Sequence, residues 1–178
     1  GELTFSAGDE SKILTVYLTG DILVEENEQF VVTLSSASGA TIGTATATGT
    51  VLNDDTALSI TADSADKNEG NANVSTSFTF TVTRIGNLTG VSVVDWYTSG
   101  TGTSPADAAD FTGYGGQMPT GTITFNALET VKTITITVLG DDLVELDEQF
   151  TVTLSNSVGA TILVPSAIGT IRNEDTVP

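Results

Sequence analysis

The chain contains an internal repeat with an offset of 120 residues. Residues 1–55 align without a gap with residues 121–175, and 27 of these 55 positions are identical. The most faithful segment is 20–30, an acidic stretch that leads into an apolar alternation, and it aligns with 140–150. This period exceeds the roughly 20 to 50 residues of solenoid and propeller repeats, so each unit is expected to be a domain with its own core.

The repeat divides the chain into a partial and a complete unit. Residues 56–178 hold a full period, whereas residues 1–55 match only its later part, so the chain is expected to be a piece of a longer protein. We predict that residues 1–55 are the C-terminal half of a repeat and form several strands, with Phe30, Val32 and Leu34 on a face that lacks its cover. Such a face favours packing against a second copy of the chain as a homodimer.

A rearranged sandwich is the alternative for this partial unit. Residues 1–55 would then pack back onto residues 56–120 and displace the later half of the complete unit. The connection through residues 53–56 is too short to reach from one end of a sandwich to the other, so the homodimer is the favoured expectation.

Charge and residue types exclude several classes of function. The 23 Asp and Glu residues against 5 Lys and Arg residues give a net charge of −18, whereas nucleic-acid binding needs a basic surface. The chain has no histidine and no cysteine, which removes Ser-His-Asp and Cys-His catalysis, disulfides and the usual nitrogen and sulfur sites for transition metals. Carboxylates and carbonyls remain, and these hard oxygen ligands suit calcium or magnesium.

Neither an enzyme nor a membrane-inserted protein is expected. Paired carboxylates act as acid and base only beside a substrate cleft, and the sequence indicates none. No apolar run approaches the roughly 20 residues of a membrane helix. A composition rich in threonine, glycine, serine and aspartate is common in large bacterial surface proteins, so we expect an extracellular or cell-surface location.

Alternating apolar and polar residues predict strands throughout the complete unit. About seven short strands in roughly 120 residues indicate an all-β, immunoglobulin-like antiparallel β-sandwich. Trp96 is expected between the two sheets, and Phe111 is expected to pin the long connection 98–121 to the sandwich. The expected strands are 58–62, 78–83, 91–97, 122–125, 133–138, 150–154 and 167–172.

Several motifs in a fixed order resemble the Calx-beta domain, a family named from sodium/calcium exchangers and also found in integrin beta-4 and in large bacterial and cyanobacterial extracellular proteins. The resemblance covers essentially the whole chain and implies an immunoglobulin-like sandwich. The motifs are Asn68-Glu69-Gly70, Ala109-Asp110-Phe111, Gly121-Thr122-Ile123-Thr124-Phe125, Thr130-Val131-Lys132, Asp141-Asp142-Leu143-Val144-Glu145, Glu148-Gln149-Phe150 and Gly169-Thr170-Ile171-Arg172-Asn173-Glu174-Asp175.

This resemblance implies a calcium site at one end of the complete unit. Calcium-binding members of the family hold their ions in a cluster of carboxylates from several loops. The implied ligands here are Glu69, Asp110, Asp141, Glu145 and Asp175, with the amide oxygen of Asn173 as a further ligand.

Two departures from exchanger-type sites lower the expected affinity. Gly140 stands where those sites have another aspartate, and Asn173 stands at another acidic position. We therefore expect one or two calcium ions bound with a Kd of about 10⁻⁴ to 10⁻³ M. The first copy keeps only a weaker half-site. That half-site consists of Asp21, Glu25, Asn53 and Asp55.

The expected function is a structural or adhesive repeat of a secreted or surface protein, in which calcium stiffens the domain ends and the hinge to neighbouring repeats. One alternative is a calcium-sensing regulatory module, and another is an ion-free accessory domain of a larger extracellular enzyme. The acidic residues also admit a plainer interpretation as solvated loop residues without an ion.

Overall fold

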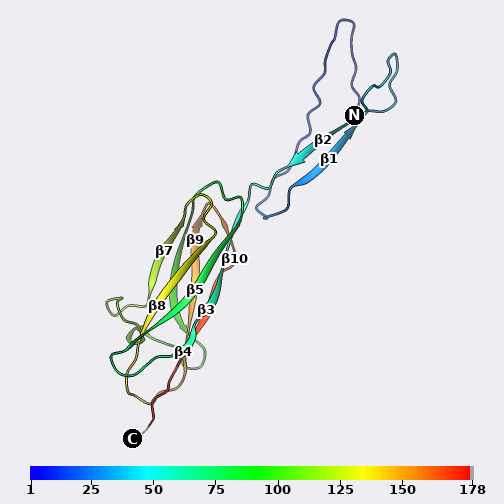
Figure 1. The fold of residues 1–178 in the computed structure, drawn as a ribbon. Helices are drawn as coiled ribbons and strands as arrows, with labels where there is room; N and C mark the ends of the chain where they lie inside the picture. Colours follow the sequence, from blue (N-terminus) through cyan, green and yellow to red (C-terminus); the bar gives the residue numbers. More distant parts are fainter. Residues whose placement is uncertain (177–178) are drawn as a thin grey trace.

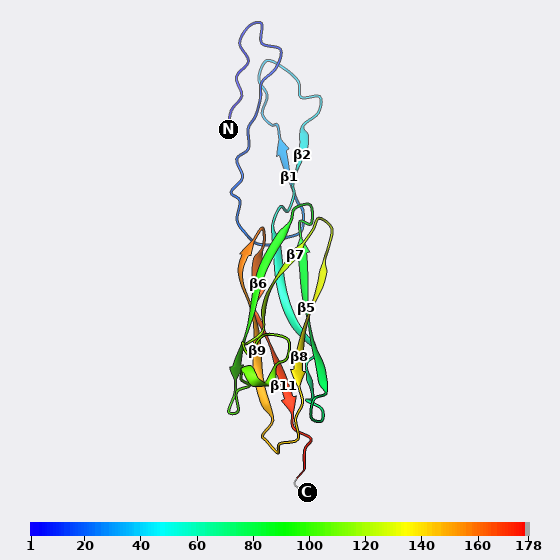
Figure 2. The ribbon, with the colours of Figure 1, turned by 90° about the vertical axis from the view of Figure 1, so that its left-hand side faces the viewer.

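The computed structural model describes residues 1–176 and consists of two units placed end to end (Figures 1 and 2). The first unit contains one hairpin, formed by β1 (Glu28–Thr33) and β2 (Thr46–Val51). The second unit begins at Thr56 and is a two-layer sandwich. The last two residues of the predicted domain 56–178 lie outside the described residues.

Nine strands make up the two sheets of the sandwich. One sheet has the order β10 (Thr161–Val164), β3 (Thr56–Ser64), β5 (Ser75–Gly86) and β8 (Val131–Leu139). The other has the order β4 (Asp66–Asn68), β11 (Ser166–Arg172), β9 (Glu148–Val158), β6 (Ser92–Thr101) and β7 (Thr120–Phe125). A short 3-10 helix, η1 (Ala108–Asp110), lies in the connection between β6 and β7.

The predicted all-β sandwich is confirmed, and each expected run falls on a strand of the complete unit. The sequence missed β4 and β10, which are short and pair in parallel with β11 and β3, whereas the other strand pairs are antiparallel. Neither missed strand has a clear apolar alternation, so pairing at a sheet edge defines them. Among residues 1–176, no helix is long and apolar enough to cross a membrane.

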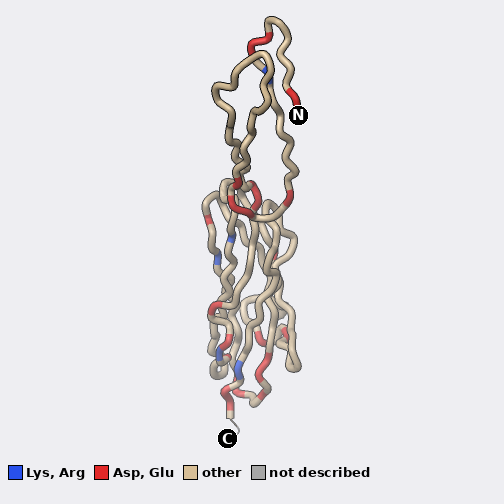
Figure 3. Tube along the Cα trace, turned by 90° about the vertical axis from the view of Figure 1, so that its right-hand side faces the viewer, with Lys and Arg blue, Asp and Glu red and all other residues tan. Residues whose placement is uncertain are grey.

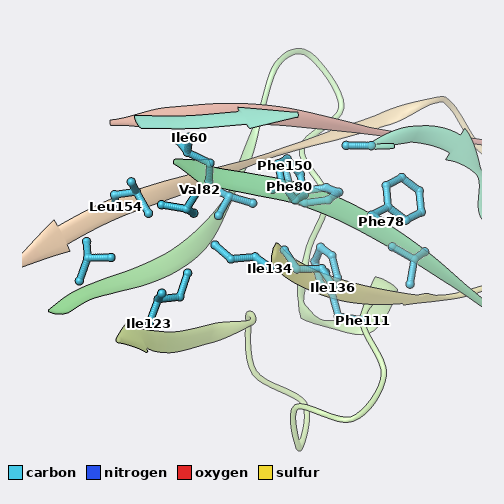
Figure 4. Close-up of a cluster of buried hydrophobic side chains, with 14 of the residues drawn as sticks. Ile60, Phe78, Phe80, Val82, Phe111, Ile123, Ile134, Ile136, Phe150 and Leu154 are labelled. Atoms are coloured by element: carbon cyan, nitrogen blue, oxygen red, sulfur yellow. The ribbon is translucent and has the colours of Figure 1, made fainter. Parts of the chain in front are cut away.

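The core lies between the two sheets and centres on Phe150 (Figure 4). The Phe150 ring meets Phe78, Phe80 and Phe111 edge to face, with centroids 5.9, 5.8 and 5.2 Å away. Gly169 faces the same ring from the neighbouring strand, and a β-carbon there would overlap it. Phe111 is 5% exposed, so the predicted anchoring of the long connection to the sandwich is confirmed.

Trp96 packs at the margin of this core. Its side chain is partly buried against the apolar cluster, and its cross-strand neighbour is Gly121. A β-carbon at Gly121 would lie 2.8 Å from the indole ring. Trp96 therefore contacts the core as predicted but remains partly accessible to solvent.

The first unit repeats part of this packing but lacks the second sheet that buries Phe150 in the complete unit. Phe30 lies over Gly49 as Phe150 lies over Gly169, yet Phe30 and Val32 are only half-buried and Leu34 is 45% exposed. The prediction of several strands here was wrong, because residues 1–55 form only β1 and β2.

Strand pairing in the complete unit explains the missing strands of the first. The segments equivalent to β7 and β8 lie within residues 1–27, and in the complete unit β7 pairs with β6 and β8 pairs with β5. Both partners belong to the half that residues 1–55 lack. The rearranged sandwich is not adopted, since β5 and β6 pair with β8, β9 and β7 of their own unit.

The repeat-related phenylalanines give a matched test of the core. We expect Phe150→Ala to lower the free energy of unfolding of the sandwich by about 3–5 kcal/mol, because a fully buried ring is removed. Phe30→Ala should leave that value nearly unchanged, since Phe30 lies in the other unit. Urea unfolding followed by the fluorescence of Trp96, the single tryptophan, measures both, and equal losses would contradict this account of the core.

Candidate metal centre

Acidic residues are concentrated towards the two ends of the sandwich (Figure 3). One group lies at the C-terminal end, and the other lies where the first unit meets the sandwich. The outward positions of the central strands carry mostly threonine and serine instead, as in the Thr79, Thr81 and Thr83 alternation of β5. The ends are therefore the places where cations would collect.

Three carboxylates converge at the C-terminal end. Glu69 follows β4, Asp141 lies in the connection from β8 to β9, and Asp175 follows β11. One oxygen from each of these groups lies within 4.8 Å of the others. Three of the five carboxylates expected from the sequence are thus brought into a single cluster by the fold.

Backbone contacts position these carboxylates. The Glu69 amide donates to the Arg172 carbonyl at 3.1 Å, which continues the β4–β11 pairing past the end of β4. The Thr76 hydroxyl donates to the Glu69 carbonyl at 2.6 Å. An Asp141 carboxylate oxygen accepts the Leu143 amide at 2.6 Å, which closes a tight turn at the start of the acidic connection.

The Arg172 guanidinium lies outside the cluster and links β4 to the segment before β9. It donates to Asp66 on β4 at 2.6 Å and to Asp147 before β9 at 2.7 Å. Hydrogen bonding to Arg172 lowers the pKa of Asp66. Arg172 is thereby committed to these two acids and does not neutralise the cluster.

Burial and mutual repulsion both act on Glu69. Its side chain is 6% exposed. Burial raises the pKa of the Glu69 carboxyl to about 7, and the charge of Asp141 is the next largest contribution. A buried acid surrounded by other acids, with no basic group beside it, is stable only when protonated or when a cation is present.

A second acidic pair lies beside the cluster. Asp107 caps η1 by accepting the Ala109 amide at 2.7 Å, and Asp110 accepts the Asp107 amide at 2.6 Å. Asp110 and Glu148 are in hydrogen-bonding contact. Burial and the charge of Asp110 raise the pKa of Glu148 to about 7, and burial also raises the pKa of Asp110.

The other two ligands implied by the resemblance, Glu145 and Asn173, lie near these acids. Glu145 is mostly exposed. Some loss of hydration at its carboxyl, followed by the charge of Asp141, raises its pKa. The Asn173 carboxamide accepts the Asp175 amide at 3.0 Å and donates to the Leu143 carbonyl at 2.7 Å. Asn173 therefore joins the chain exit after β11 to the connection from β8 to β9. Its amide oxygen already accepts one hydrogen bond.

The groups present fit a calcium ion. Among the described residues, Asp175 Oδ2 and Glu174 Oε2 are buried without a hydrogen-bond donor. Buried oxygens of this kind are costly unless a donor or cation satisfies them. The donor set consists of carboxylates and carbonyls from several loops, and this is the chemistry that calcium takes, with six to eight oxygens.

Gly140 has a steric explanation. A β-carbon at this position would overlap the Gly70 carbonyl. The Gly140 amide donates to the Val74 carbonyl at 2.8 Å, and its own carbonyl accepts the Asn73 amide at 3.0 Å. Close approach of two backbone segments therefore requires glycine here, in place of the additional aspartate of exchanger-type sites.

The half-site of the first unit lies at the junction with the sandwich. Asp21, Glu25, Asn53 and Asp55 line one shallow pocket there. The Asn53 side chain accepts the Glu25 amide at 3.0 Å and donates to the Asp55 carbonyl at 3.0 Å. Within residues 1–176, these acids do not form a compact three-carboxylate group like that of the complete unit.

Three acids near the cluster were not predicted from the sequence, namely Glu148, Asp107 and Glu174. Glu148 has a recognisable signal, because it shares the inward side of β9 with Phe150 and Val152. An acid at an inward position on the first residue of a strand indicates a site at the end of a sandwich. Asp107 and Glu174 have no comparable signal, since their placement depends on the conformation of a loop and of the chain exit.

The molecule is a β-sandwich domain with loop carboxylates gathered at one end. The Calx-beta domain model matches residues 1–63 and 53–175. The chain therefore belongs to the Calx-beta domain family.

Solved structures agree with the fold of the complete unit. The apo form of the Calx CBD1 domain is 22% identical over 67% of this chain and 98% of that chain, with a TM-score of 0.53. The calcium binding domain CBD12 of CALX1.1 is 24% identical over 68% of this chain and 47% of that chain, with a TM-score of 0.54. The Calx CBD2 domain is 16% identical over 66% and 86%, with a TM-score of 0.53.

The raised pKa values predict an unusual pH dependence in the absence of calcium. Glu69 and Glu148 bind protons more tightly in the folded state, so their stabilising effect is complete below the ordinary pKa of 4.5 and is lost as the pH rises through about 7. In chelator, the free energy of unfolding should therefore increase as the pH falls from about 8 to about 5.5. Urea unfolding at a series of pH values measures this slope.

Matched variants separate these groups from general charge repulsion. Glu69→Gln together with Glu148→Gln should flatten the slope. Glu129→Gln should leave it unchanged, because hydrogen bonding to Lys132 lowers the pKa of Glu129. A double variant with the same slope as the original chain would show that the buried carboxyls do not cause it.

Proposed function

We propose that the complete unit is a calcium-binding module and that calcium fixes the loops at its C-terminal end. The observation that carries this proposal is the convergence of Glu69, Asp141 and Asp175, with the Asp175 Oδ2 atom buried and lacking a donor. Glu145 and the Asp110–Glu148 pair would supply further oxygens. Carboxylates this close repel strongly, and a divalent cation converts that repulsion into attraction.

The expected consequence is order at the end of the sandwich. Apart from Glu148 on β9, the proposed ligands come from four separate segments: the segment after β4, η1, the connection from β8 to β9, and the chain exit after β11. An ion held by all four would add a cross-link to the hydrogen bonds that already join some of them, such as the one from Asn173 to the Leu143 carbonyl. Because the unfolded chain cannot assemble this site, calcium should stabilise the fold.

We propose a structural or adhesive role in a secreted or cell-surface protein. The acidic, cysteine-free composition supports this role, as does the end-to-end arrangement of the units (Figure 2). Asp175 lies at the exit of the complete unit and Asp55 at the exit of the first, so calcium at either place would stiffen the connection to the next repeat. Small interfaces between domains otherwise permit relative motion.

No catalytic role is proposed. The pocket lined by Asp147, Gln149 and Arg172 is small, and its charged groups are already engaged in ion pairs or strand contacts. An accessory domain of a larger extracellular enzyme is compatible with this proposal, with catalysis elsewhere.

A calcium sensor is the alternative, favoured by the position of the cluster at the chain exit. Ion binding there could change the direction in which the chain leaves the sandwich. A sensor needs two states with different calcium affinities, and small-angle scattering during a calcium titration tests for them. An unchanged profile supports the structural module and contradicts the sensor.

A homodimer through the first unit is a further part of the proposal. Ile13 and Tyr17 are each 91% exposed, and within the described part of the chain Phe30 has none of the aromatic partners that surround Phe150. Packing two such faces together would bury apolar surface. Sedimentation equilibrium tests this, and a monomer with ordered residues 1–55 would contradict it.

Thermal unfolding in chelator and across a calcium series tests the metal site directly. We expect the midpoint to rise with calcium and to rise less with magnesium, because magnesium gives up its water reluctantly. Asp141→Asn together with Glu145→Gln should abolish most of the rise. The same change in the first copy, Asp21→Asn together with Glu25→Gln, is the matched control and should leave most of it in place.

No shift at millimolar calcium would contradict the proposal. The acidic cluster would then be solvated surface, and the module would be a spacer or adhesive repeat that works without ions. A shift that survives the Asp141 and Glu145 substitutions would place the ion elsewhere in the chain.

A further inference from the structure

Arg84 is the largest fully buried side chain of the sandwich and is 2% exposed. Among the described residues, no carboxylate forms an ion pair with it. A buried charge is costly unless hydrogen bonds replace its hydration. In a chain with a net charge of −18, this cation is stabilised by hydrogen-bond acceptors rather than by an acid, and its Nε is buried without a partner within residues 1–176.

Backbone carbonyls supply most of these hydrogen bonds. The guanidinium donates to the carbonyls of Asn126 at 2.8 Å, Gly90 at 3.1 Å, and Leu88 and Phe125 at 3.4 Å. It also donates to the Ser92 hydroxyl at 3.3 Å and lies 5.4 Å from the centre of the Phe125 ring. Only the planar, many-donor head group of arginine can reach so many acceptors at once.

Most of these acceptors lie on the two connections at one end of the sandwich. Leu88 and Gly90 belong to the β5–β6 connection, and Asn126 belongs to the β7–β8 connection. The Leu128 amide also donates to the Leu88 carbonyl at 2.8 Å, which joins the two connections directly. Arg84 therefore fixes the shape of this end from inside.

The first unit rests on the same β5–β6 connection. The Asn87 amide donates to the Asp55 carbonyl at 2.7 Å, and the Thr56 hydroxyl donates to the Asn87 carbonyl at 2.6 Å. A β-carbon at Gly86 would overlap the Asp55 carbonyl and lie 3.0 Å from Val24 Cγ2. The last residues of the first unit and its acidic connection thus pack directly on this connection.

We propose that Arg84 is a positioning residue for the junction, which holds the Gly86–Gly90 connection in the shape that receives Asp55 and Val24 and so sets the orientation of the first unit. The role differs from that of the proposed calcium ligands of the complete unit, which lie at the opposite end of the sandwich. It does not depend on calcium, so it stands or falls separately from the proposed metal site.

Distances between two spin labels test this role. The chain has no cysteine, so Ser38→Cys and Thr133→Cys, both exposed, place one nitroxide on each unit. Double electron–electron resonance in chelator should give a narrow distance distribution for the otherwise unchanged chain. Arg84→Lys, which keeps the charge but loses most donors, should broaden that distribution by about twofold or more, towards the free motion that is usual for small interfaces.

Arg172→Lys is the matched control, since Arg172 is the only other arginine and lies at the opposite end. It should leave the distribution narrow. If Arg84→Lys does not fold, as judged by its thermal transition, Ser92→Ala removes one partner of the guanidinium and should still broaden the distribution. The proposal is overturned if the folded Arg84→Lys variant leaves the width of the distribution unchanged. It is also overturned if Ser92→Ala, used in place of that variant, leaves the width unchanged. Equal broadening by Arg172→Lys would overturn it as well.

Discussion

The packing of Phe150 between the sheets is the contact on which the rest of the sandwich depends. Its ring joins β5, through Phe78 and Phe80, to the long β6–β7 connection, through Phe111. Asp110 precedes Phe111, and Glu148 precedes Phe150 by two residues on the same side of β9. The aromatic cluster therefore helps to position Asp110 and Glu148, the acidic pair beside the three-carboxylate cluster.

At the C-terminal end, the packing of the core and the repulsion within the acidic cluster have opposite effects on the stability of the fold. Apolar burial holds the loops together, while the carboxylates on those loops repel and resist desolvation. The raised pKa values of Glu69 and Glu148 express this conflict. These acids gather while Arg172 pairs with Asp66 and Asp147 instead, and this arrangement is the basis for proposing a cation site at this end.

Local patterns predicted much of the fold. Alternation in segments such as Thr133–Val138 depends only on which face of a strand meets the core, so it is visible in the sequence. β4 and β10 were missed because strand pairing alone defines them, and the strands expected in residues 1–27 did not form because their partners lie in the other half of a repeat. The motifs that resemble the Calx-beta family located Glu69, Asp141 and Asp175, whereas Gly140 shows its steric role only once Gly70 lies against it.

The parallel pairing of β4 with β11 bears on mechanical load. β4 follows the first strand of the sandwich, β11 is its last strand, and the chain enters and leaves at opposite ends (Figure 1). Tension between the two ends would pull these strands in opposite directions along their length, so that the bonds joining them are sheared together rather than opened one at a time. The ion pair between Asp66 and Arg172 spans the same two strands. A repeat built in this way resists stretching at the β4–β11 pair, before its core is exposed.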